Sequence, residues 1–377
     1  MPPSRRAVLR AGLMAGAGAT GLSLLGLVRD GTPAADVEPS SGTSSPAMVP
    51  AGAAPSSPWA AGAGESSGGS AFNTGWLFGG EYTPGAELAS YDDGAFTPVT
   101  LPHTVTPLSW GSWDPASWQK VWIYRRHFDG TSLPAGRVFV DFDGVMVDAV
   151  AVLNDHVVGS HTGGYLPWSV ELTDYLAGGD NVLTVVVDSR CLPVPPSAPG
   201  CSPGDIDYLQ PGGIYRDAAI RVVPPVFLAD VFARPADVLT AGRRVDIQAT
   251  IDAAIAPAAP AQITVELLDG SRRLAAAAGT VRPRAGFTTT AVTLTDLAEV
   301  TLWSPDTPKL YTVRATLSVP GGDSHTLSRR IGFREAAFRP DGFYLNGERL
   351  QLFGLDRHQL FPYLGMAAPA RLQRQDA

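Results

Sequence analysis

From residue 71 onward the sequence consists of short apolar runs separated by turn-forming residues, and this alternation most constrains the fold. Residues 138–142 and 150–153 have the β-branched and aromatic composition of strands, and Asn154-Asp155 supplies a hairpin turn after the second. Glycine (41 residues) and proline (33) are abundant, whereas charged residues make up only 17% of the 377-residue chain. Because helical periodicity is rare, we expect a mainly β protein.

The spacing of the apolar runs predicts two β-sandwiches. Residues 71–225 are expected to form a jelly-roll-like sandwich with long loops, and residues 226–336 an immunoglobulin-like sandwich. Beyond the two strands above, the expected strands are 182–187, 218–223, 245–251, 263–268 and 311–317.

The N-terminal 70 residues have a different character. Ser4-Arg5-Arg6 followed by an apolar run rich in Ala and Gly resembles a twin-arginine export signal over residues 1–30. Residues 31–70 are almost entirely small and polar, which is typical of a disordered linker. We therefore expect an exported protein, extracellular or in the cell envelope, that meets a membrane only through this signal segment.

Charge and cysteine content exclude some classes of function. The net charge is −8 and no basic cluster lies beyond the extreme N-terminus, so nucleic acid is excluded as a partner. Cys191 and Cys201 lie in a proline-rich loop without the four ligands that zinc prefers. The two cysteines could form a disulfide, as an exported protein allows, or remain two unpaired thiols, and the disulfide is slightly favoured.

Several motifs occur in an order that resembles glycoside hydrolase family 2, whose members include β-galactosidases, β-mannosidases and β-glucuronidases. The resemblance runs from about Trp76 to the last residue and implies a sugar-binding jelly roll, an immunoglobulin-like sandwich and a catalytic (β/α)8 barrel. The stretches that carry it are 100–104 with 124–126, 142–145 with 153–156, 163–165, 212–217, 302–311, and 331–334 with 345–347 and 354–358.

Most of these motifs also have a purely structural interpretation. Gly212–Asp217 could be a tight turn with a solvated Arg216–Asp217 pair, and Trp303 could fill core volume at a corner of the second sandwich. Tryptophans of the first sandwich could stack on sugars, but most aromatic side chains in a β-sandwich belong to the core. They are Trp76, Trp110, Trp113, Trp118 and Trp122.

The resemblance implies a carbohydrate, specifically a β-glycoside, as the binding partner. The family's matching His contacts a sugar hydroxyl at the end of the first barrel strand, which implies substrate-binding roles for His358 and its neighbour Arg357. Asp207, with Asp205 as the alternative, matches an Asp that reaches into the sugar pocket of β-galactosidases and helps to hold a cation. No other cofactor is implied. Family members often form homo-oligomers.

The chain lacks the residues that would cut the glycosidic bond. Retaining hydrolysis needs two carboxyl groups about 5 Å apart, and the family places the first in an Asn-Glu pair, a dipeptide that this sequence does not contain. Residues 337–377 are expected to be the incomplete beginning of the barrel, with a hairpin over 343–353 and a helix over 371–377. We therefore expect a truncated, catalytically inactive front part of a β-glycosidase, with a β-galactoside as the favoured substrate. The alternative is a non-catalytic carbohydrate-binding protein.

Overall fold

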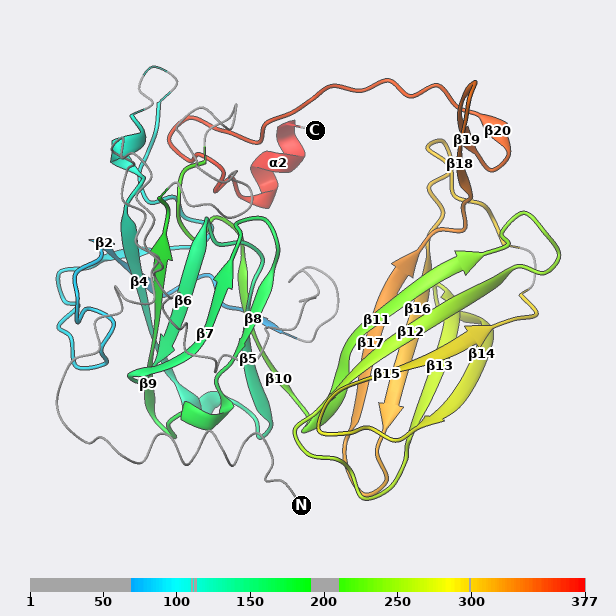
Figure 1. Ribbon diagram of the computed structural model, residues 1–377, viewed down its shortest axis with the longest axis horizontal. Coiled ribbons are helices and arrows are strands. Elements are labelled where there is room, and N and C mark those ends of the chain that lie inside the picture. Colours follow the sequence, from blue (N-terminus) through cyan, green and yellow to red (C-terminus); the bar gives the residue numbers. More distant parts are fainter. Residues whose placement is uncertain (1–68, 110, 112–113, 191–209, 298–299, 377) are drawn as a thin grey trace, which may run out of the picture.

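The structure is a computed structural model in which the chain forms two β-sandwiches side by side (Figure 1). It describes residues 69–109, 111, 114–190, 210–297 and 300–376. The expected signal segment and most of the expected linker lie outside these residues. The prediction of a mainly β protein built from sandwiches is confirmed, since every strand pairing is antiparallel and regular helix is confined to short segments.

The first sandwich packs a four-stranded sheet of order β1-β10-β5-β8 against a six-stranded sheet of order β3-β2-β4-β9-β6-β7. Its strands are β1 (Ser70–Ala71), β2 (Trp76–Glu81), β3 (Thr97–Val99), β4 (Val121–Asp129), β5 (Arg137–Phe142), β6 (Asp148–Leu153), β7 (His156–Thr162), β8 (Trp168–Glu171), β9 (Asp180–Asp188) and β10 (Ala218–Val223). Short 3-10 helices occupy Pro115–Ser117, Gly130–Ser132 and Thr173–Tyr175. The four strands predicted here are confirmed.

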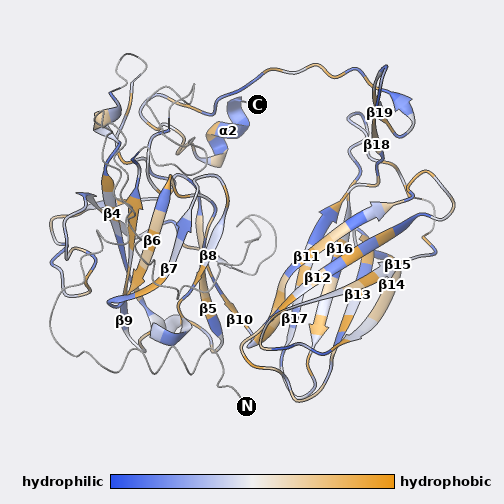
Figure 2. Cartoon of the chain, in the orientation of Figure 1, coloured by the Kyte–Doolittle hydropathy of each residue, from blue (hydrophilic) through white to orange (hydrophobic). Residues whose placement is uncertain are grey.

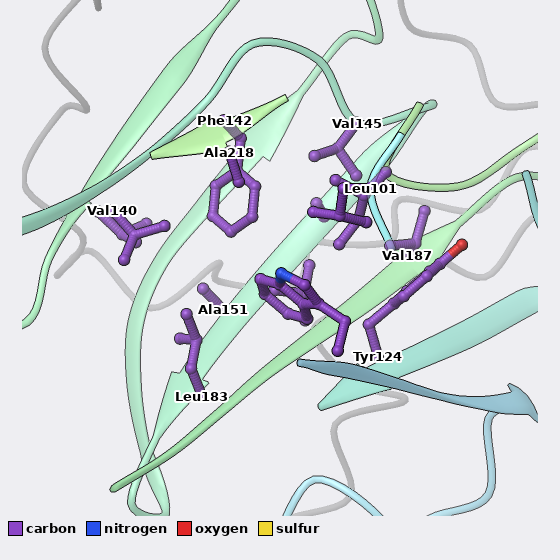
Figure 3. Close-up of a cluster of buried hydrophobic side chains, with 14 of the residues drawn as sticks. Leu101, Tyr124, Val140, Phe142, Val145, Ala151, Leu183, Val187 and Ala218 are labelled. Carbon is purple, nitrogen blue, oxygen red and sulfur yellow. The ribbon is translucent and has the colours of Figure 1, made fainter. Parts of the chain in front are cut away.

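The core of the first sandwich lies between these two sheets (Figure 3). Phe142 from β5 stacks on Trp168 from β8 with ring centroids 5.1 Å apart, and both side chains are completely buried. Leu183 and Tyr124 approach from the facing sheet. Aromatic residues of this size contribute several kcal/mol each when fully buried, so they hold the sheets that carry the loops above them.

The second sandwich has a three-stranded sheet of order β11-β12-β15 facing a four-stranded sheet of order β14-β13-β16-β17. Along β12, Val245, Ile247, Ala249 and Ile251 are buried and alternate with more exposed residues, as a strand with one face on a core requires. The same banding of apolar and polar segments is visible along the strands of both sandwiches (Figure 2). The strands are β11 (Val226–Ala236), β12 (Arg244–Ala253), β13 (Ala261–Asp269), β14 (Arg272–Val281), β15 (Gly286–Leu294), β16 (Tyr311–Ser318) and β17 (Ser324–Ile331).

A buried ion-pair cluster joins the two sandwiches. Arg137 of β5 donates from Nε and Nη2 to both oxygens of Glu171, at 2.8 Å each, and from Nη2 to Asp252 of β12 at 3.1 Å. Its guanidinium carbon lies 5.2 Å and 5.3 Å from the ring centroids of Phe139 and Phe227, one from each sandwich. A bidentate pair that is shielded from water gives the contact a defined geometry.

The corner of the second sandwich differs from its prediction. Trp303 is only half-buried and does not fill core volume. Its ring centroid lies 4.9 Å from the guanidinium carbon of Arg334, and its backbone N–H donates to the carbonyl of Phe333. The motif at residues 302–311 therefore packs on the surface of the sandwich end and does not contribute to its core.

A small sheet of β18 (Ala336–Arg339), β19 (Gly342–Leu345) and β20 (Glu348–Arg349) follows. Asn346 and Gly347 adopt left-handed φ values of 52° and 84°, which confirms the predicted turn. The second strand of the predicted hairpin is wrong, because the regular strand pairing ends at Arg349. The N–H of Leu350 still donates to the carbonyl of Phe343 at 2.9 Å, but Gln351–Phe353 lie outside the hairpin. Phe353 and Leu355 are 87% and 97% exposed, with no neighbouring strand in the described residues to pack against them.

Residues 350–360 cross in extended form from the second sandwich back to the first, where helix α2 (Ala370–Asp376) is located (Figure 1). The helix predicted over 371–377 is confirmed through residue 376. The described residues of 337–377 contain no parallel strand pair, so the expected barrel beginning stays a prediction.

Candidate functional site: a hollow on the rim of the first sandwich

The returning segment is anchored to the rim of the first sandwich by a backbone hydrogen bond and by packing. The N–H of Tyr363 donates to the carbonyl of Leu108 at 2.6 Å, and within the segment the N–H of Phe361 donates to the carbonyl of Gly365 at 3.0 Å. Ala367 is buried against Met146 and Tyr215. This docking brings the Arg357-His358 pair to a rim that is far from it in sequence.

A hollow with about 490 Å³ of empty space opens where the segment meets the rim. This space includes open solvent at the mouth of the hollow. Residues from the first sandwich and from the returning segment line it: Tyr165, Arg216, Arg357, His358, Gln359, Leu360 and Met366.

The two site residues predicted in the described part of the chain, Arg357 and His358, therefore share one hollow. Arg357 donates from Nη2 to Oε1 of Gln373 at 3.2 Å and forms an ion pair with Asp376, so α2 holds its guanidinium group. His358 is exposed. The predicted Asp207, its alternative Asp205, and Cys191 and Cys201 lie outside the described residues.

Two lining residues, Tyr165 and Arg216, were not identified as site residues from the sequence. Arg216 donates from Nη1 to the backbone carbonyls of Tyr165, at 3.1 Å, and Asp143, at 3.4 Å. The expected Arg216–Asp217 pair is wrong, because Asp217 instead accepts from Nδ2 of Asn73 at 2.9 Å. The available signal was that Tyr165 and Arg216 both lie inside motifs that carry the family resemblance.

The glycines before Arg216 serve packing. Gly213 has a φ of +124°, and a Cβ there would lie 2.6 Å from the carbonyl oxygen of His103. A Cβ on Gly212 would overlap the side chain of Ser189. The turn thus lies flat against the sheet and places Arg216 on the rim.

The tryptophans predicted to belong to the core do so where the structure describes them. Trp76, Trp118 and Trp122 are buried in the first sandwich. Trp110 and Trp113 lie outside the described residues. No described member of this group is available to stack on a sugar.

Two half-buried histidines, His103 and His325, are expected to destabilise the protein in acid. Burial lowers the pKa of His103 to about 4, and burial together with the charge of Arg221 lowers that of His325 to about 4. The unfolded value is about 6.5. The unfolded chain therefore binds more protons than the folded chain between these values, and stability falls as the pH drops from 6.5 towards 4.

We expect a loss of about 1 kcal/mol per histidine between pH 7 and pH 5. The difference between the folded and unfolded pKa values alone would give a loss of about 2 kcal/mol for each histidine. Because both rings are partly exposed, solvent screening reduces this loss. Urea unfolding at the two pH values measures the loss, and a His103→Gln, His325→Gln double variant should show a flatter dependence. An unchanged slope in the double variant would assign the effect to other groups.

The described residues show no other obvious functional centre. No three or more of their His, Cys, Asp and Glu side chains gather so that they could hold a metal ion. None of the helices in the described ranges combines the length and apolar character needed to cross a membrane.

Comparison with known proteins decides the family. The model of the family 2 sugar-binding domain of glycosyl hydrolases matches residues 83–224, and the model described as glycosyl hydrolases family 2 matches residues 226–334. The chain belongs to glycosyl hydrolase family 2. It corresponds to the N-terminal part of its relatives.

The relatives of this family 2 chain include β-galactosidases and a β-glucuronidase. It is 30% identical over 315 residues to a β-galactosidase of Thermoanaerobacterium thermosulfurigenes, covering 81% of this chain and 42% of the relative. A β-galactosidase of Thermoanaerobacter pseudethanolicus is 31% identical over 324 residues, covering 81% and 41%. The crystal structure of a Bacteroides uniformis β-glucuronidase superimposes with a TM-score of 0.71 at 25% identity, over 82% of this chain and 37% of that one. The chain thus spans about two fifths of the length of these relatives.

Proposed function

We propose that this chain is the sugar-binding front part of an exported retaining β-glycosidase, with a β-galactoside as the favoured substrate. The observation that carries the proposal is the meeting of His358 and Arg357 with the family's sugar-binding sandwich at one hollow. The β-galactosidases among the relatives favour galactose, and the β-glucuronidase fold neighbour makes the glucuronide the next candidate.

The roles within the hollow follow from the chemistry of the side chains. An exposed imidazole can donate or accept a hydrogen bond to a sugar hydroxyl without adding a fixed charge. Arg357, held by Gln373 and Asp376, would fix the backbone that presents His358. Apolar contact with a sugar face would come from Leu360 and Met366. The two carboxyl groups of hydrolysis would come from sequence that residues 1–377 do not include.

Export, a cation near Asp207, a Cys191–Cys201 disulfide and assembly into homo-oligomers belong to the same proposal. The Ser4-Arg5-Arg6 stretch supports export, and an oxidising compartment supports the disulfide. A carboxylate such as Asp207 is a suitable ligand for a hard cation. Export is tested by replacing Arg5 and Arg6 with Lys, which should retain the protein in the cytoplasm.

The deciding experiment compares this chain with the product of its locus sequenced through and beyond codon 377. Residues 1–377 should not hydrolyse any aryl β-glycoside, whereas the longer product should hydrolyse the β-galactoside. In that product, His358→Ala should lower kcat/KM about 100-fold, since a hydrogen bond that strengthens in the transition state is lost. His156→Ala is the matched control, because His156 is exposed and does not line the hollow. Turnover by purified residues 1–377 would refute the assignment.

A second candidate is a carbohydrate-binding protein without catalysis. The match of residues 83–224 to the family's sugar-binding domain and the hollow at the rim of that sandwich favour it. This candidate predicts that a confirmed stop codon at 378 leaves a chain that binds a glycoside, and that no product of the locus turns it over.

A further inference from the structure

Arg216 is one of two arginines of the first sandwich that form no ion pair with a described carboxylate, and unlike Arg126 it lines the hollow. Six arginines lie in the described part of this sandwich, and Arg126 lies over the ring of Phe72 and donates to its carbonyl. Four others form ion pairs with carboxylates: Arg125 with Asp93, Arg137 with Glu171, Arg190 with Asp188 and Arg221 with Asp141. Arg216 pairs with no carboxylate of the described residues, yet it lines the hollow.

The surroundings of Arg216 hold its guanidinium group in place. Nη1 is occupied by the carbonyls of Tyr165 and Asp143, and the guanidinium carbon lies 5.0 Å from the ring centroid of Tyr215. A Cβ on Gly144 would lie 2.9 Å from Cδ of Arg216, so the stem packs against bare backbone. The side chain is therefore ordered before any ligand arrives, which lowers the entropic cost of binding.

The Nε–Nη2 edge of the Arg216 guanidinium group is available to bind a ligand. Its Nε and Nη2 make no hydrogen bond within the described ranges, and neither is among the fully buried polar atoms that lack partners. Both N–H groups are thus accessible to solvent. The Nε–Nη2 edge of a guanidinium group matches a carboxylate or sulfate oxygen pair in bidentate geometry.

The charge of the hollow contrasts with that of the protein. The chain carries a net charge of −8, but the described residues that line the hollow include no Asp or Glu. The positive charge of Arg357 is compensated by its ion pair with Asp376. Arg216 therefore carries a positive charge in the hollow that no described carboxylate compensates. A neutral sugar would leave that charge without a partner, whereas an anionic group would satisfy it.

We propose that Arg216 receives an anionic substituent, a carboxylate or a sulfate ester, of the glycan bound in this hollow. The inference rests on the proposed function, because it assumes that the hollow binds a β-glycoside. It adds a specificity-determining residue and narrows the ligand from glycosides in general to acidic ones.

The test measures binding of four probes to residues 1–377 by ligand-observed NMR. The probes are methyl β-galactoside, methyl β-galacturonide, methyl β-galactoside 6-sulfate and inorganic sulfate. At least one acidic glycoside should bind about 10- to 100-fold more tightly than the neutral one, as expected for a charge-assisted pair. Arg216→Met should remove that advantage, so that the acidic and the neutral glycosides bind with affinities within about twofold of each other.

Arg243→Met is the matched control, because it changes the net charge equally on the second sandwich and Arg243 does not line the hollow. It should keep the preference, and thermal unfolding should show that both variants are folded. Whichever acidic glycoside gains affinity identifies the source of the anion.

Equal affinities for acidic and neutral glycosides would overturn the inference alone and leave the proposed function standing. So would a preference that survives Arg216→Met, or inorganic sulfate binding as tightly as the sulfated sugar, since that marks an adventitious ion only. Failure of all three glycosides to bind at saturating concentrations would overturn both proposals.

Discussion

Replacing Arg125 by methionine is expected to lower the free energy of unfolding by about 3–5 kcal/mol, the usual cost of removing one partner from a buried ion pair. The guanidinium group is completely buried on β4. Nε donates to Asp93 at 2.7 Å, and Nη1 donates to the carbonyls of Ala86 and Leu88 at 2.8 Å and 2.7 Å. The side chain of Arg125 therefore holds the segment 82–96 against the outer face of the six-stranded sheet through these hydrogen bonds.

Loss of Arg125 would leave the carbonyl of Ala86 without this donor, that of Leu88 with the N–H of Tyr91, and Asp93 with His127. Burial raises the pKa of Asp93, but hydrogen bonds from His127 and Arg125 outweigh it and hold the pKa below its usual range. The carboxylate is therefore charged at neutral pH and accepts hydrogen bonds from both side chains. Methionine fills a similar volume but donates nothing, so the segment should also exchange its amide hydrogens faster.

Urea unfolding and hydrogen exchange of residues 82–96 measure the effect. The Arg125→Met, Asp93→Asn double variant should recover part of the loss, because it removes the negative charge that Arg125 compensates. Arg234→Met, at an exposed pair with Asp246, should cost less than 1 kcal/mol. A cost below 1 kcal/mol for Arg125→Met would mean that the segment is held by its apolar contacts alone.

Gly213→Ala is expected to destabilise the protein by about 2–6 kcal/mol. Strain at φ +124° contributes about 1–3 kcal/mol, and overlap with a packed neighbour adds about 1–3 kcal/mol. The built Cβ would lie 2.6 Å from the carbonyl oxygen of His103 and 2.8 Å from the hydroxyl oxygen of Tyr124, which is itself hydrogen-bonded to the imidazole of His103. The turn would shift outward and carry Arg216 away from the hollow.

The matched control is Gly178→Ala, since a Cβ there meets nothing within 4 Å and its φ is not in the left-handed region. It should change the unfolding free energy by less than about 1 kcal/mol. If Gly213→Ala unfolds like the control, the turn must relax more readily than its contacts indicate. If it is unstable but still folded, the preference for acidic glycosides should weaken with it.

Local patterns predicted the strands well because strand formation depends on neighbours in sequence. The alternation of Val245, Ile247, Ala249 and Ile251 places one face on a core whatever that core is. The turns at Asn154-Asp155 and Asn346-Gly347 were likewise predictable, since these residues tolerate positive φ. The family resemblance added the order of the pieces and the significance of Arg357-His358.

Local patterns failed where a long-range contact decided the outcome. Leu350–Phe353 has the composition of a strand, but the regular strand pairing ends at Arg349 and the chain continues to the first sandwich. Arg216 and Asp217 are neighbours of opposite charge, yet each finds its partner elsewhere in the sandwich. A pair of adjacent residues on one turn cannot reveal which backbone carbonyls will pack against them.

The sequence by itself therefore determined the class of fold, most of the strands, two of the turns and two members of the candidate site. Only the tertiary structure decided that Tyr165 and Arg216, 51 positions apart, share a hollow with His358. It also decided that Arg216 lacks a carboxylate partner among the described residues. The physical reason is that backbone periodicity is a property of neighbouring residues, whereas charge compensation is a property of whatever packing brings together in space.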